Sequence, residues 1–207
     1  MLGGFLLANF IFTRFKINMM SVSFYGLKEN IQYGHEAIAR VKEDYPNGFK
    51  SNTYYDTFVE KQDPDVRHEY TQAIYRTRDI IDEKIRHGKS EREATEIAVS
   101  KTGAANCGEQ AFLVSNRLNE MGIKNKVINM VISSNTTRMV QGGHTFCVID
   151  TDNPIDPREP RNWSSDAVVV DMWANKVMKA QDAINYFYSL FKPDSTKQFV
   201  QFTRVFE

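Results

Sequence analysis

Apolar positions in the first half of the chain recur every three or four residues, which is the period of an α-helix. Turn and capping signals interrupt this periodicity: Gly88 and Gly103 each follow a periodic run, and Ser90 with Glu93 has the spacing of a capping box. The pattern therefore predicts three helices, over residues 27–45, 64–87 and 90–102.

The second half begins with an apolar run that predicts a buried helix over residues 108–121, with Gly122 as its stop. The runs that follow predict three strands, a helix and a last strand, at residues 127–132, 144–150, 167–171, 178–191 and 199–206. Helices followed by an antiparallel sheet are typical of an α+β domain. We therefore expect one domain over residues 1–207, with a helical part (1–102) and a core (103–207) in which a central helix packs on the sheet.

Composition excludes several classes of protein. The 26 basic residues balance 26 acidic ones, which argues against a nucleic-acid-binding protein or a polybasic membrane anchor. The apolar segment 3–13 is too short to cross a bilayer, so we expect a soluble protein without stable membrane insertion. The only two cysteines, Cys107 and Cys147, cannot form a disulfide framework or an all-cysteine zinc site, and no metal or cofactor motif is found.

Cys107 lies where a glycine-marked turn meets the predicted buried helix. The free backbone N–H groups and the dipole at a helix N-terminus favour a thiolate, which is the nucleophilic form of cysteine. The same N–H groups can stabilise an oxyanion on an attacked carbonyl. Gly108 leaves room for a substrate, and Asn106 and Gln141 are both candidates for a second oxyanion donor.

Two predicted strands supply the other members of a possible catalytic triad. His144 opens one strand and Asp171 ends another, so antiparallel pairing of these strands places the two side chains together. The imidazole would take the thiol proton, and the carboxylate would orient the imidazole. Each residue alone has a structural explanation, as a core cysteine, a capping histidine or a turn aspartate, but the combination favours catalysis. Cys147 has an odd offset from His144 and is predicted to face the core.

Three stretches of the sequence resemble the transglutaminase-like superfamily of papain-fold cysteine enzymes. These stretches are NCGEQA (106–111) with LNEMGI (118–123), HTFCVID (144–150), and VVVDMW (168–173) with Trp163 upstream. They cover about a third of the chain, and Met172 stands where the family usually has proline. The resemblance implies a papain/transglutaminase-like fold. It also implies Cys107, His144 and Asp171 as the triad.

The resemblance further implies a protein substrate, an acyl-thioester intermediate and no cofactor. Deamidation or transglutamination of a glutamine side chain is ranked ahead of peptide-bond cleavage, and a non-catalytic protein-binding module is the alternative from another class. Trp163 and Trp173 are candidate walls of a substrate slot, although aromatic residues near strand ends are as often core. Loops 133–143 and 151–166 are expected to contact the substrate. The helical half (1–102) shows no family pattern, and in this the chain resembles bacterial secreted effectors, which often combine such a catalytic core with unrelated helices. This resemblance implies either a cytoplasmic protein or one delivered into a host cell.

Overall fold

The computed structural model describes residues 26–52, 63–137, 140–149, 163–191 and 198–206. The helices in this part of the chain are α1 (Leu27–Asp44), α2 (Pro64–Arg86), α3 (Glu91–Thr102), α4 (Cys107–Glu120) and α5 (Ala180–Phe191). The strands are β1 (Asn125–Ser134), β2 (Val140–Ile149), β3 (Val168–Asp171), β4 (Lys176–Lys179) and β5 (Gln198–Phe206). The predicted α+β class is confirmed. The apolar segment 3–13 and most of loop 151–166 lie outside the described residues.

Local sequence signals explain where the first helices begin and end. The side chain of Asp63 accepts a hydrogen bond from the backbone N–H of Asp65 and caps α2. Ser90 and Glu93 form the predicted capping box at the start of α3. Gly103 follows α3 with a φ of 66°, a left-handed conformation that glycine adopts without steric cost.

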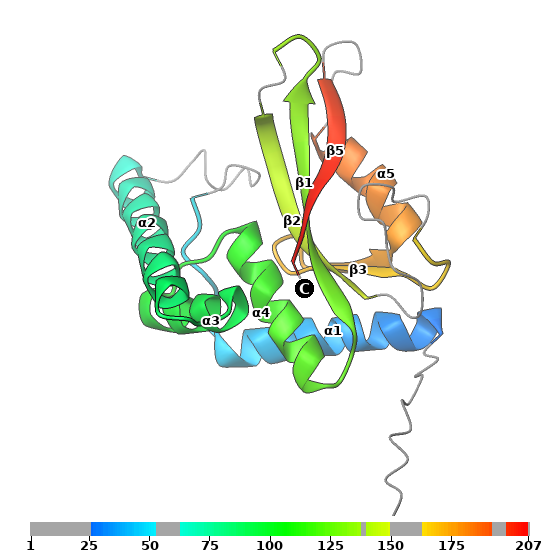
Figure 1. The fold of residues 1–207 in the computed structure, drawn as a ribbon, viewed down its shortest axis with the longest axis horizontal. Helices are drawn as coiled ribbons and strands as arrows, with labels where there is room; N and C mark the ends of the chain where they lie inside the picture. Colours follow the sequence, from blue (N-terminus) through cyan, green and yellow to red (C-terminus); the bar gives the residue numbers. More distant parts are fainter. Residues whose placement is uncertain (1–25, 53–62, 138–139, 150–162, 192–197, 207) are drawn as a thin grey trace, which may run out of the picture.

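The five strands form one antiparallel sheet in the order β4-β3-β2-β1-β5 (Figure 1). The strands that carry His144 and Asp171 are neighbours in this sheet, as the sequence pattern predicts. β3 pairs with β2 only along Cys147–Ile149, whereas β1 pairs with almost the whole of β2. β2 therefore extends well beyond β3 in the direction of His144.

The hairpin of β1 and β2 is longer than the sequence pattern predicts. Most of the expected loop 133–143 is strand, because β1 continues to Ser134 and β2 already begins at Val140. Backbone pairing with β1 holds Gly142 and Gly143 in the ladder, although glycine disfavours strands in isolation. His144 consequently lies inside β2 and not at its start, which corrects the sequence-based prediction.

Strand β4 is absent from the sequence-based prediction, and helix α5 begins at Ala180 and not at residue 178. β4 has four residues, with its two lysines exposed. It follows β3 through a turn in which Asn175 has a φ of 52°. A half-exposed edge strand this short contains too few residues to show a two-residue periodicity.

Helices cover both faces of the sheet (Figure 1). α1 and α4 pack on one face around Val127, Cys147 and Val170, and α5 covers Phe146 and Val169 on the other. α1 thus shares a buried core with the second half of the chain. α2 pairs with α3, which in turn packs on α4. None of the described helices combines the length and apolar character needed to span a membrane.

Candidate functional site

The structure brings Cys107, His144 and Asp171 together. Nε2 of His144 lies 2.7 Å from Oδ2 of Asp171, and the side chain of Cys107 forms a hydrogen bond with the same imidazole. Because Nε2 faces Asp171, Nδ1 is the ring nitrogen that remains for the thiol. His144 and Asp171 are buried, while Cys107 is half-buried. The three side chains therefore form a continuous chain that ends at a thiol with partial access to solvent.

Three different elements hold these side chains in place. Cys107 is the first residue of α4, His144 lies inside β2, and Asp171 is the last residue of β3. β3 leaves β2 just before the position of His144, so the carboxylate at its end reaches the ring. α4 packs against β2, and its start lies beside Thr145, the residue that follows His144.

Charge and burial have opposite effects on His144. Burial disfavours the protonated ring, but hydrogen bonds to Asp171 and Cys107, with the Coulombic attraction of both groups, raise the pKa of His144 to about 9. The imidazolium is consequently the favoured form at neutral pH. A protonated imidazole beside a cysteine is the partner that a thiolate requires.

The carboxylate and the imidazole are both fixed by further contacts. Oδ1 of Asp171 accepts a hydrogen bond from the backbone N–H of Ala174 at 3.1 Å, which leaves Oδ2 for His144. The ring of His144 lies edge-on to Trp173 at 5.3 Å and to Phe187 at 5.4 Å between centroids. These contacts restrict the rotation of the imidazole, as a preorganised site requires.

A network of hydrogen bonds fixes the turn before Cys107. The backbone N–H of Asn106 donates to Oε2 of Glu109 at 2.9 Å, and Arg78 on α2 donates to Oε1 at 3.2 Å. Oδ1 of Asn106 accepts from the hydroxyl of Ser51 and from the backbone N–H of Asn52. Nδ2 of Asn106 donates to Oδ1 of Asn52 at 2.8 Å. Residues from the first half of the chain therefore support the start of α4.

Of the other predicted site residues, Gly108 and Trp173 lie beside members of the triad, whereas Trp163 does not. Of the atoms in the described residues, a Cβ added to Gly108 would come within 4 Å only of Oγ1 of Thr145, at 4.0 Å, so these residues leave space beside Gly108. Trp173 lies against His144, whereas Trp163 is 7% exposed and packs in the core against Phe146 and Phe202.

Of the two candidates for the second oxyanion donor, Asn106 and Gln141, the structure describes the side chain of Asn106. The amide of Asn106 is engaged with residues 51 and 52, which gives it a role in holding the turn. The side chain of Gln141 lies outside the described residues.

Sequence reasoning misses three residues that contribute to the site: Glu109, Arg78 and Phe187. Glu109 follows Asn106 by three residues, and this spacing of an N-cap residue and a glutamate is a signal that the sequence contains. Arg78 and Phe187 reach the site from α2 and α5, so only the packing of those helices reveals them.

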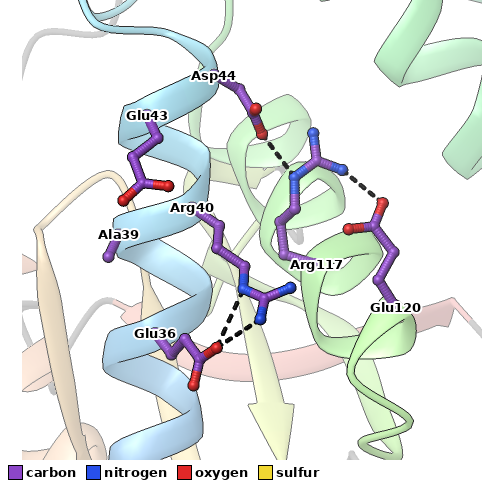
Figure 2. Close-up of a pocket in the computed structure, with 7 residues that line it drawn as sticks. All are labelled: Glu36, Ala39, Arg40, Glu43, Asp44, Arg117 and Glu120. Atoms are coloured by element: carbon purple, nitrogen blue, oxygen red, sulfur yellow. Dashed lines mark hydrogen bonds and ion pairs between the residues drawn. The ribbon is translucent and has the colours of Figure 1, made fainter.

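A separate groove of about 700 Å³ lies between α1 and α4 (Figure 2). Its lining contains no member of the triad and consists of Glu36, Ala39, Arg40, Glu43, Asp44, Arg117 and Glu120. Arg117 pairs with Asp44 on α1 and with Glu120 on its own helix, and Arg40 pairs with Glu36. The pair of Arg117 with Asp44 connects the two helices, whereas the other two pairs each lie within one helix.

Comparison with known proteins yields no match to this chain among family models, curated proteins or solved structures. Function is therefore inferred from the chemistry of the site. Among the described residues, no group of three or more His, Cys, Asp or Glu side chains is arranged to hold a metal ion.

Proposed function

We propose that this protein is a thiol enzyme with a papain/transglutaminase-like fold that attacks protein amide groups with Cys107. The hydrogen-bonded chain from Asp171 through His144 to a thiol at a helix N-terminus carries the proposal. The arrangement supplies a nucleophile, a proton acceptor and a group that orients the acceptor. A helix that begins at the cysteine and an antiparallel strand that carries the histidine support the fold assignment.

In the first half of the reaction, the thiolate of Cys107, whose proton His144 already holds, attacks the amide carbonyl carbon. The new C–S bond makes the carbonyl oxygen an oxyanion, which the free N–H groups at the start of α4 stabilise. The imidazolium then gives its proton to the amide nitrogen as the C–N bond breaks. The products of this step are an acyl thioester and ammonia or an amine.

In the second half, water or an amine attacks the thioester while His144 accepts its proton. The C–S bond breaks, and the thiolate is left beside the protonated His144, which restores the starting state. Water gives deamidation if the acyl group comes from glutamine and proteolysis if it comes from a peptide bond. A second amine gives transglutamination.

We propose a glutamine side chain as the substrate group. The thiol is half-buried and its imidazole partner is 2% exposed, which supports an amide group that can reach the sulfur end-on. A side-chain amide enters end-on, whereas a main-chain amide needs space for a polypeptide on both sides. Peptide-bond cleavage is the alternative reaction, and a protein-binding module is the non-catalytic alternative.

Thiol labelling tests whether Cys107 is activated. We expect iodoacetamide at neutral pH to modify Cys107 at least about tenfold faster than Cys147, because the helix N-terminus and His144 favour the thiolate. Burial raises the pKa of Cys147 to about 12, which makes it an internal reference. His144→Ala should slow the labelling of Cys107. Equally slow labelling of both cysteines would support the non-catalytic module.

Ammonia release from a glutamine-containing protein substrate, with and without an added primary amine, tests the reaction. Turnover that releases ammonia and depends on both Cys107 and His144 supports the proposal, and incorporation of the amine identifies transglutamination. Cys107→Ser is the matched control, because it preserves the shape of the site and removes the sulfur. Cleaved polypeptide without ammonia release would identify a protease.

A further inference from the structure

We propose that Arg78 is a positioning residue for Cys107, acting through Glu109. The inference rests on the proposed function, since it concerns the thiol that would attack the substrate. Arg78 neutralises the carboxylate that caps α4, and this keeps the start of the helix able to stabilise a thiolate.

Glu109 is a buried carboxylate two residues after the nucleophile. Its side chain is only 9% exposed, and its two oxygens have different partners. Oε2 accepts from the backbone N–H of Asn106, the residue just before Cys107, and Oε1 accepts from the guanidinium of Arg78. One side chain thus connects the N-cap of α4 to α2.

Two negative charges compete for the same end of the helix when Cys107 ionises. The positive end of the dipole and the free N–H groups favour both the carboxylate and the thiolate, but the two repel each other. Without a counter-charge, the buried carboxylate would raise the free energy of the thiolate. Arg78 supplies that counter-charge. Its side chain is 53% exposed, so solvent screens the effect and a moderate change is expected.

The other charged groups around α4 have partners of their own. His144 of β2 pairs with Asp171 of β3, and Lys50 of the segment before the turn pairs with Glu69 of α2. Asp44 of α1 and Glu96 of α3 bind Arg117 at the far end of α4. Arg92 of α3 donates to the hydroxyl of Ser115 in the second half of α4. Within the described residues, Arg78 is the base that contacts Glu109.

The pH dependence of Cys107 alkylation tests this inference. The rate of iodoacetamide modification of the Cys107 peptide is followed by mass spectrometry between pH 5 and 10, and the midpoint of the rate profile is measured. We expect Arg78→Gln to move the midpoint upward by about half a pH unit, equivalent to about threefold slower alkylation below the midpoint. Glu109→Gln should move it downward, because the amide oxygen still accepts from Asn106 but carries no charge.

Matched variants separate charge from structure. Arg78→Lys should restore a midpoint close to that of the wild type, and Arg78→Gln/Glu109→Gln should lie between the single variants. Arg76→Gln, which removes an exposed arginine from the same helix, should leave the midpoint unchanged. Circular dichroism confirms that each variant is folded.

The outcomes distinguish this inference from the proposed function. Midpoints that shift in opposite directions for Arg78→Gln and Glu109→Gln support it, since loss of structure alone would not produce opposite signs. If Cys107 is activated by His144 but both variants leave the midpoint unchanged or move it in the same direction, this inference is wrong and the proposed function stands. If wild-type Cys107 shows no activation, both are wrong.

Discussion

At the scale of single residues, the site depends on the balance of forces at His144. The ring is buried, which disfavours a charge, yet Asp171 accepts a hydrogen bond at 2.7 Å and Cys107 contacts the same ring. These contacts outweigh burial and raise the pKa of the imidazole to about 9 from an ordinary value of 6.5. Protonation of His144 is therefore linked to the stability of the folded state.

This linkage predicts how stability depends on pH. The raised pKa means that the folded state binds the proton more tightly than the unfolded state does, so the stabilisation is complete below pH 6.5 and is lost as the pH rises towards 9. The loss should amount to about 3 kcal/mol in the free energy of unfolding. Urea denaturation at a series of pH values measures it.

His144→Gln provides the comparison, because it removes the titrating group and retains a polar side chain. The free energy of unfolding of this variant should fall less than that of the wild type between pH 6.5 and 9. Parallel pH profiles for the two proteins would show that His144 is not protonated in the folded state.

At the scale of elements, the position of α1 on β3 and β4 matters because β3 carries Asp171. Gly34 permits this close packing: a Cβ at this position would lie 2.8 Å from Cγ1 of Val177 and 2.9 Å from Cγ2 of Val170. Real Cβ atoms do not approach other carbons so closely, so a larger residue would push the helix away from the sheet. The glycine thus fixes the distance between two layers.

Gly34→Ala should lower the free energy of unfolding by about 2 kcal/mol, because the clash outweighs the better helix propensity of alanine. Chemical denaturation measures this change. Gly34→Ala/Val177→Ala should lose less than the sum of the two single variants, since the second change removes the side chain that the new methyl group meets. Additive losses would show that the helix shifts freely at this position.

At the scale of the whole molecule, local sequence signals predict where the helices begin and end better than they predict which distant residues come into contact. The helices and their caps follow from periodicity and from residues such as Asp63, Ser90 and Gly103. The sequence also indicates Cys107 at a helix start and Asp171 at a strand end, and it indicates His144 although the ring lies inside β2 and not at the predicted strand start. The pairing of Arg78 with Glu109 and the contact of Phe187 with His144 depend on how distant elements pack, which periodicity does not encode.

Arg117 joins three helices across the molecule. It contacts Asp44 of α1, Glu96 of α3 and Glu120 of α4, and its own side chain is only 12% exposed. Arg117→Gln should therefore lower the free energy of unfolding by about 2 kcal/mol, because it leaves several carboxylates without their partner. Arg40→Gln is the matched control in the same groove (Figure 2), where an exposed pair within α1 contributes less than about 0.5 kcal/mol. Equal losses in thermal or urea denaturation would contradict this role for Arg117.

The pairing of β5 with β1 has a consequence for handling the protein. β5 covers the side of β1 that faces away from β2, along Val127–Ser134. A chain cut before Gln198 would uncover the backbone donors and acceptors of a strand rich in Val and Ile. Such an edge recruits strands from other copies, so C-terminal truncation should produce aggregates in preference to a smaller folded protein.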